Sequence, residues 1–220
     1  MNNAQLPTPN SQTWLPPSGG RSIVLVRHGR PAVASWGRHR ITGRDIGQWY
    51  RRYDELGLAG KVEPPAVLRE LAASAGCIVA SDSRRAMESA MRLAAADRIR
   101  VEPALREVAF PDSLDVPIRL SPNTWLMLAR AAQLLNACDS EERVRDVRLR
   151  AAAVVERLAT LAEEHGTVLA IGHGWFNHFV ASELRKRRWR GPMRPSTGYW
   201  DTTAYIHSVR FQADLDTRAR

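Results

Sequence analysis

Two short apolar runs in this chain each end abruptly at a glycine-flanked histidine. Residues 23–26 are aliphatic and are followed by Arg27-His28-Gly29. Residues 168–171 have the same character and are followed by Gly172-His173-Gly174. Runs of this length that are rich in β-branched residues predict buried strands of a parallel sheet. Because ligands bind at the carboxyl edge of such sheets, we expect the two histidines to belong to one site.

Strands and helices are predicted to alternate along the chain. The predicted strands are 22–27, 77–80, 99–101, 167–171 and 203–209. The predicted helices are 45–56, 66–75, 81–96, 123–135, 144–161 and 175–187. This alternation is typical of an α/β fold with three layers, α/β/α, around a mostly parallel central sheet.

Polar residues precede two of the predicted helices. Ser81, Asp82 and Ser83 offer N-cap side chains for the helix that follows the second strand. Asp139 and Glu142 have the spacing of a capping box ahead of the longest helix, in which apolar residues recur every three or four positions. We therefore expect side-chain caps at the beginning of both helices.

The composition predicts a single domain with polar ends. Residues 21–210 are expected to form one α/β domain, within which the less regular segment 112–139 is a small helical insertion or cap. Residues 1–20, rich in Pro, Asn, Ser and Gly, are expected to be a flexible N-terminal extension without the pattern of a signal peptide, and residues 211–220 a C-terminal tail. No apolar run approaches the roughly 20 residues that span a bilayer. Two cysteines without CxxC spacing favour the cytoplasm.

Basic residues outnumber acidic ones by 32 to 23, and all but two of them are arginines. Arginine favours planar contacts with phosphate or carboxylate, so the charge suggests an anionic partner. A first group begins at the first histidine motif, which favours a small anionic substrate there; it consists of Arg27, Arg30, Arg38, Arg40 and Arg44. A second group at 185–190 is a weak nucleic-acid footprint, and the cationic end of a helix explains it better. Nucleic acid is therefore not expected as the main partner.

Several common catalytic motifs are absent from the sequence. There is no GxxxxGK[ST] loop, no GxSxG elbow and no HExxH helix, and the spacing of His173 and His178 does not suit metal binding on one helix face. Histidine and arginine at strand ends are suited to phosphoryl chemistry, because a neutral imidazole can attack phosphorus while guanidinium groups hold its oxygens. Neither a metal nor a cofactor is expected.

Four segments of the chain resemble the histidine phosphatase superfamily, which includes cofactor-dependent phosphoglycerate mutases and many small phosphatases. Arg27-His28-Gly29 matches its signature, and Gly172-His173-Gly174 resembles its second histidine motif. Residues 81–90 look like its SPLxRAxQTA segment, which aligns Arg85 with the second phosphate-binding arginine. Leu105-Arg106-Glu107 resembles the segment that carries its proton donor. The resemblance covers residues 22–208.

The resemblance implies a role for each matching residue. His28 would attack the phosphoryl group, while Arg27, Arg85 and His173 hold its oxygens and Gly29 lets the backbone approach. Glu107 would protonate the leaving oxygen and then activate water. Independently of the resemblance, Arg30, Arg38 and Arg44 lie in the basic loop that we expect to contact the substrate. The implied activity is a metal-independent phosphatase for a small phosphomonoester.

Departures from the family pattern leave alternatives open. The family's Gly-Asp-Trp-Glu-Gly continuation after the donor is missing, and Asp112 in the replacing segment competes with Glu107 for the donor role. A phosphoglycerate mutase-type phosphotransferase is one alternative activity. A phosphate-binding or regulatory module with impaired catalysis is another. The substrate is not specified, and the oligomeric state is open, with a homodimer among the options.

Overall fold

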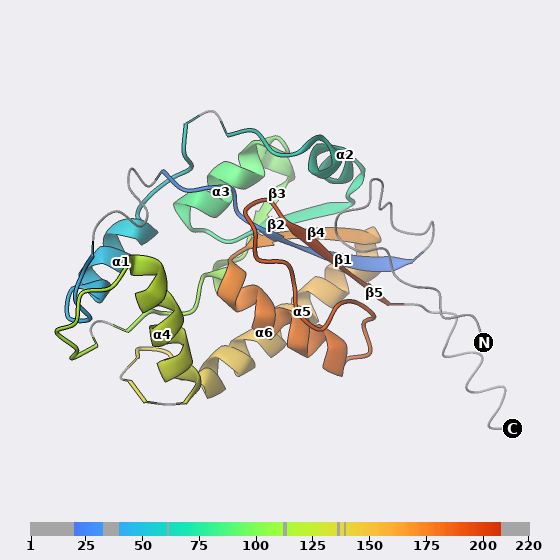
Figure 1. Cartoon of the computed structure of the whole chain (residues 1–220). Coiled ribbons are helices and arrows are strands. Elements are labelled where there is room, and N and C mark those ends of the chain that lie inside the picture. The colour runs from blue at the N-terminus through green and yellow to red at the C-terminus, as the bar shows by residue number, and fades with distance from the viewer. Residues whose placement is uncertain are drawn as a thin grey trace, which may run out of the picture.

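A mostly parallel sheet runs through the centre of the molecule (Figure 1). The computed structural model describes residues 20–32, 40–60, 62–111, 114–135, 137–138 and 140–207. Within these residues the sheet has the strand order β3-β2-β4-β1-β5. Its strands are β1 (Arg21–Arg27), β2 (Cys77–Ala80), β3 (Ile99–Val101), β4 (Thr167–Gly172) and β5 (Thr202–His207). Only β5 runs antiparallel to its neighbour among them, so the predicted sheet type is confirmed.

Helices cover both faces of this sheet, which confirms the predicted three layers. The helices are α1 (Ile46–Asp54), α2 (Ala66–Ser74), α3 (Arg84–Met91), α4 (Pro122–Leu134), α5 (Val144–His165) and α6 (Gly174–Lys186), with short 3₁₀ turns η1 (Ala96–Arg98) and η2 (Pro103–Leu105). Helices α2 and α3 pack on one face, and α5 and α6 pack on the other (Figure 1). None of the helices in the described part of the chain is long and apolar enough to cross a membrane.

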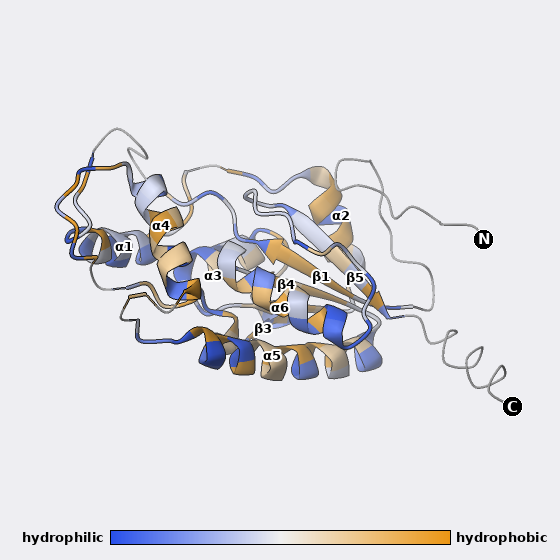
Figure 2. Ribbon diagram, turned by 60° about the horizontal axis from the view of Figure 1, so that its bottom comes forward, coloured by the Kyte–Doolittle hydropathy of each residue, from blue (hydrophilic) through white to orange (hydrophobic). Residues whose placement is uncertain are grey.

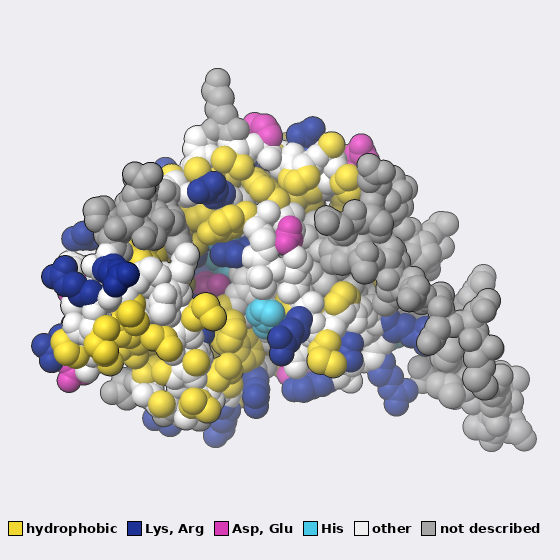
Figure 3. All heavy atoms as spheres, viewed as in Figure 1, with side chains coloured by type: hydrophobic (Ala, Val, Ile, Leu, Met, Phe, Trp, Pro, Cys, Tyr) yellow, Lys and Arg dark blue, Asp and Glu magenta, His cyan; other side chains and the backbone are white. Residues whose placement is uncertain are grey.

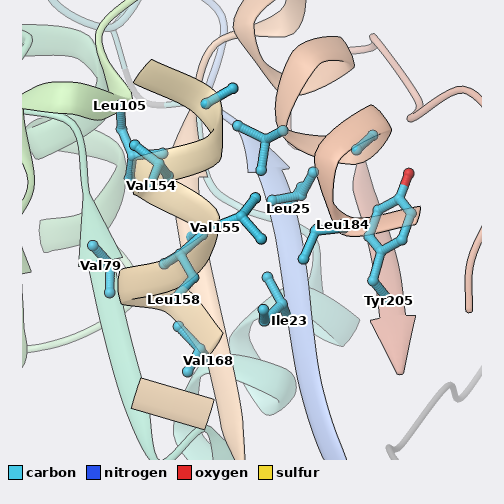
Figure 4. Close-up of a cluster of buried hydrophobic side chains, with 14 of the residues drawn as sticks. Ile23, Leu25, Val79, Leu105, Val154, Val155, Leu158, Val168, Leu184 and Tyr205 are labelled. Carbon is cyan, nitrogen blue, oxygen red and sulfur yellow. The ribbon is translucent and has the colours of Figure 1, made fainter. Parts of the chain in front are cut away.

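The alternation of side chains along β1 divides the core into two clusters. Ile23 and Leu25 point toward α5 and α6, whereas Val24 and Val26 point toward α2 and α3. Figure 4 shows the first cluster, in which the β1 side chains lie among residues of α5, α6 and β5. In Figure 2 the strand is apolar between its ends, as expected for a strand buried on both faces.

A third apolar cluster lies apart from the sheet. Ile46 of α1 packs with Trp125 and Ala129 of α4 and with Phe110. The segments at Ile41–Gly43 and Leu114–Leu120 pair beside these helices through backbone hydrogen bonds. We call this unit, residues 41–54 and 114–134, the cap. In Figures 1 and 2 its helices lie side by side beyond the end of β1 that carries the first histidine motif.

The structure corrects the expected helix caps. Helix α5 begins at Val144 after Arg143, so the predicted capping box of Asp139 and Glu142 is wrong. Glu142 instead pairs with Arg150 within α5, and Asp139 lies outside the described residues. Ser83 is the N-cap residue of α3, but its hydroxyl makes no cap hydrogen bond and faces the site instead. The side chains of Glu142 and Ser83 therefore make tertiary contacts, which outweigh their local preference for capping a helix.

Candidate active site

Two adjacent parallel strands bring His28 and His173 together. Arg27 of β1 is in register with Gly172 of β4, and the backbone N–H of His28 donates to the Gly172 carbonyl over 3.0 Å. The two imidazole centroids are 5.1 Å apart, in an edge-to-face arrangement. Each histidine is about 1% exposed. The two glycine-flanked histidines therefore share one buried site at the carboxyl edge of the sheet.

Hydrogen bonds fix the tautomer of His28. Its Nδ1 lies 2.8 Å from the carbonyl of Gly29, which accepts, so Nδ1 carries the proton. Its Nε2 accepts from Nε of Arg85 over 3.1 Å. Burial, followed by the charges of Arg85 and Arg27, lowers the pKa of His28 well below its usual 6.5. The imidazole is therefore neutral near pH 7, with its lone pair on Nε2.

His173 is also held neutral, but in the opposite tautomer. Its Nδ1 accepts from Nη2 of Arg85 over 3.2 Å, because a guanidinium can only donate. Its Nε2 therefore carries the proton and lies 3.0 Å from Oγ of Ser83 and 3.3 Å from Oγ of Ser81. Burial, followed by Arg85 and His28, lowers the pKa of His173 well below 6.5.

Arg85 connects the two histidines. It lies in the first turn of α3, which begins shortly after β2 reaches the same edge of the sheet. Besides the imidazoles, its guanidinium binds Asp54, with Nη1 donating to the backbone carbonyl over 3.0 Å and Nη2 to Oδ1 over 2.8 Å. Burial alone would lower the pKa of Arg85, but Tyr53 and Asp54 raise it above its usual value. Arg85 is therefore a buried cation that orders the site.

Arg27 and Gly29 flank the first histidine. The guanidinium of Arg27 lies 4.3 Å from the ring centroid of Tyr199 and donates to the Thr197 carbonyl. The backbone N–H of Gly29 donates to Oγ of Ser89 over 2.9 Å. A Cβ at Gly29 would lie 2.3 Å from the ring of Trp200, so the close approach of these two segments requires glycine.

Glu107 lies at the N-terminus of α6. Its Oε1 accepts from the backbone N–H groups of Val108 (2.9 Å) and Phe176 (2.8 Å), and its Oε2 accepts from that of Trp175 (3.1 Å). The N-terminal end of a helix attracts negative charge and holds a carboxylate in place. Glu107 lines both cavities described below, whereas Asp112, its rival as proton donor, lies outside the described residues.

Arg150, which is paired with Glu142, holds the backbone of the loop that contains Glu107. Nη1 of Arg150 donates to the carbonyls of Ala104 (2.7 Å) and Arg106 (2.8 Å). The same guanidinium forms a two-bond ion pair with Glu142, with both distances 2.7 Å. We call residues 104–109 the Glu107 loop. Its backbone is thus tied to helix α5 rather than left free.

Two neighbouring cavities open between the cap and the sheet, where Figure 3 shows the surface hollowed. The first has a volume of about 580 Å³, and the residues that line it include Arg27, Arg30, Tyr50, Tyr53, Glu107, Arg130, Trp175, His178 and Tyr199. The second has a volume of about 560 Å³, and its lining includes Asp54, Ser83, Arg106, Glu107 and His173. Glu107 and Tyr50 belong to both linings, so the cavities adjoin.

Comparison with protein families identifies the fold and the motifs together. The family model described as histidine phosphatase superfamily (branch 1) matches residues 23–205. The chain belongs to the histidine phosphatase superfamily. The match includes both histidine motifs and the segment from Arg85 to Glu107. A comparison with curated proteins finds no match.

Solved structures of similar fold include mutases and phosphatases. A phosphoglycerate mutase from Bacillus anthracis is 17% identical with a TM-score of 0.55, covering 86% of this chain and 88% of that one. A phosphoserine phosphatase variant from Entamoeba histolytica, in complex with phosphoserine, is 13% identical with a TM-score of 0.50, covering 86% and 91%. A mycobacterial glucosyl-3-phosphoglycerate phosphatase is 22% identical with a TM-score of 0.48, covering 76% and 80%. At these identities the first two likenesses support the fold alone.

The arginines of the expected substrate loop have different locations in this member of the superfamily. Arg30 is exposed and lines the first cavity. Arg44 forms an exposed ion pair with Asp115 over 2.7 Å, on the cap and outside the lining of both cavities. Arg38 lies outside the described residues. Of the two arginines that the structure describes, Arg30 is therefore the one that lies at the first cavity.

Sequence reasoning missed several polar residues of the site. Asp54, Arg130 and Tyr199 contact or line it, yet none belongs to a motif or a periodic pattern. Tyr199 lies 5.8 Å from the His28 ring, between centroids, because the segment before β5 passes over the end of β1. In the described part of the chain, no cluster of three or more His, Cys, Asp or Glu side chains is arranged to hold a metal ion.

Proposed function

We propose that this member of the superfamily is a metal-independent phosphatase that hydrolyses a small phosphomonoester through a phosphohistidine intermediate. The observation that carries the proposal is the state of His28: it is buried and neutral, with its lone pair on Nε2 and two arginines beside it. A nucleophilic imidazole needs that protonation state, and the transferred phosphoryl group needs that positive charge.

In the first half of the reaction, the hydrogen bond from Nε of Arg85 to Nε2 of His28 breaks, and Nε2 attacks phosphorus in line with the ester oxygen. The N–P bond forms as the P–O bond to the alcohol breaks, and the leaving oxygen takes a proton from protonated Glu107. Arg27 and Arg85 counter the charge on the non-bridging oxygens. The hydrogen bond from Nδ1 of His28 to the Gly29 carbonyl supports the positive charge that the imidazole gains.

In the second half, water attacks phosphorus while the N–P bond breaks. Glu107, now a carboxylate, accepts a proton from that water, and His28 returns to its neutral form as phosphate is released. The position of Glu107 on the border of both cavities supports this double role. Asp112 remains the alternative donor.

The cavities support a small substrate. A volume of about 580 Å³ suits a metabolite rather than a macromolecular surface. Aromatic side chains from three parts of the chain, Tyr50, Trp175 and Tyr199, contribute to its walls.

In the basic segment 185–190, Lys186 pairs with Glu183 and Arg187 with Glu156, so these charges are partly neutralised within the protein. We expect action in the cytoplasm, since Cys77 is a buried core thiol.

The test is hydrolysis of a generic aryl phosphate in the presence of EDTA, with wild type, His28→Ala and His165→Ala. We expect metal-independent turnover by wild type and by His165→Ala, whose histidine lies at the far end of α5. His28→Ala should lose activity by several orders of magnitude, because no other group of the site replaces the nucleophile. Rapid quenching should give a phosphoenzyme with the phosphate on the peptide that contains His28.

Other outcomes would favour the alternatives. Phosphoenzyme that transfers its phosphoryl group between phosphoglycerates faster than to water would identify a mutase. Phosphate binding without turnover on a broad panel of phosphate esters would indicate a binding or regulatory module. EDTA-sensitive turnover that persists in His28→Ala would contradict the proposed mechanism.

A further inference from the structure

The most deeply buried cation of the site is paired with a carboxylate from the cap. The side chain of Arg85 is 1% exposed, and that of Asp54, its ion-pair partner, is 52% exposed. Asp54 is the last residue of α1 and lines the second cavity together with Ser83 and His173. The carboxylate therefore lies between Arg85 and solvent, on the side from which an anion would approach.

Arg85 needs an anion when the site is empty. Its other partners, His28 and His173, are both neutral and offer lone pairs but no charge. A buried charge that loses its only counter-charge is strongly destabilising, because desolvation is no longer offset. Asp54 supplies this counter-charge through Oδ1 and adds its backbone carbonyl at the C-terminal end of α1.

A phosphoryl group would need the same N–H donors. Nε of Arg85 donates to His28, and one N–H of Nη2 donates to His173, which leaves Nη1 and the second N–H of Nη2 for the oxygens of a substrate. Both of these nitrogens now bind Asp54. Carboxylate and phosphate both fit the guanidinium fork, and two anions on one fork repel each other.

We propose that Asp54 is a competing ligand of Arg85, which neutralises the empty site and is displaced by the phosphoryl group of the substrate. Its return would help to expel the phosphate product. The inference rests on the proposed function in so far as Arg85 binds phosphate. The half-exposed position of Asp54 allows its side chain to turn into the cavity without unfolding α1.

The test is calorimetric titration of the full chain with inorganic phosphate, comparing wild type, Asp54→Asn and Glu70→Gln. Asp54→Asn keeps the shape and removes the charge, so phosphate should bind about tenfold more tightly. Glu70→Gln makes the same charge change on the exposed surface of α2, outside the lining of both cavities, and its effect should stay within about twofold. Phosphate should also raise the melting temperature of Asp54→Asn more than that of wild type.

Steady-state kinetics give a second readout. Asp54→Asn should lower KM and the inhibition constant of phosphate together, whereas loss of a residue that merely positions Arg85 would raise KM and lower kcat. Equal or weaker phosphate binding by Asp54→Asn, with Asp54→Ala behaving alike and both variants folded, would overturn the inference.

The experiments can overturn the proposed role of Asp54 and the proposed phosphatase activity independently of each other. Turnover that depends on His28, without tighter phosphate binding by Asp54→Asn, would overturn the role of Asp54 alone. Tighter binding by Asp54→Asn, without His28-dependent turnover in any variant, would support competition at Arg85 and overturn the phosphatase. Absence of phosphate binding in all three proteins would overturn the role of Asp54, and the hydrolysis assay would decide the phosphatase independently.

Discussion

The two neutral histidines of the site have complementary tautomers because one arginine donates to both. Arg85 presents Nε to His28 and Nη2 to His173, so the proton of each imidazole must lie on its other nitrogen. The proton of His28 is then held by a backbone carbonyl and that of His173 by serine hydroxyls. A guanidinium that never loses its proton thus determines where the imidazole protons lie.

This arrangement makes the stability of the protein depend on pH. The pKa of His28 and that of His173 are lowered in the folded chain, whereas the unfolded chain titrates near 6.5. As the pH falls through 6.5, the unfolded state binds protons that the folded state excludes. The free energy of unfolding should therefore decrease from about pH 7 to about pH 5.5, by up to about 1.4 kcal/mol per pH unit for each histidine.

Urea unfolding across this pH range measures the effect. The variants His28→Asn and His173→Asn should each show a shallower pH dependence than wild type, whatever their stability at neutral pH. An unchanged slope in both variants would mean that other groups cause the acid sensitivity.

At the scale of elements, three helices hold the Glu107 loop. Helix α5 holds its carbonyls at Ala104 and Arg106 through Arg150, and the cap holds those at Val108 and Ala109 through Arg130. The N-terminus of α6 holds the carboxylate itself. Three helices therefore position one loop.

We expect Arg150→Lys to reduce kcat about tenfold with little change in KM, because the lysine cannot reproduce the forked contacts to the loop and to Glu142. The loss should be greater for alkyl phosphates than for nitrophenyl phosphate, since only poor leaving groups depend on protonation by Glu107. Arg157→Lys is the matched control, because Arg157 forms a similar fork with Glu102 from the same helix but is more exposed. Equal losses for both substrates would contradict a role in positioning the proton donor.

The sequence predicts the elements that have a local signal and the meeting of the two strand ends that carry His28 and His173, but it does not predict which side chains from distant segments pair with one another. Strands 77–80 and 99–101 occur at the predicted residues, because β-branched runs between turns are a local signal. The ion pair between Arg85 and Asp54 joins residues 31 positions apart, and the bonds from Arg150 to the Glu107 loop span 44 or more. No local spacing encodes such contacts. The predicted capping box of Asp139 and Glu142 is wrong for the same reason, because Glu142 forms an ion pair with Arg150 instead.

At the scale of the whole molecule, the cap and the sheet have separate apolar clusters. The cap cluster centres on Trp125, which is buried and donates through Nε1 to the Ile41 carbonyl over 2.8 Å. The cap contributes Asp54, Tyr50 and Arg130 to the site, whereas the sheet delivers both histidines. The arrangement of the two units thus determines the shape of the cavities.

Trp125→Ala should loosen the cap while leaving the sheet intact. Removal of a buried tryptophan costs about 3–5 kcal/mol, and here the cost falls on a small local cluster. Amide hydrogen exchange should accelerate in α1 and α4, with β1 and β4 still protected, and KM should rise. Equal acceleration in β1 would show that the cap and the sheet unfold as one unit.

The position of β1 between β4 and β5 has a consequence for synthesis on the ribosome. Among the described strands, the first in the sequence pairs with the last two, so the backbone of Leu25 lacks its partners until Ala170 and Thr203 have been synthesised. At the usual speed of translation this delay lasts roughly ten seconds or more. During that time the apolar strand β1 lacks its neighbouring strands, so it can pair with other exposed segments and misfold. A nascent chain that stops short of Gly172 also cannot place His28, so abortive products carry the nucleophile without the site that activates it.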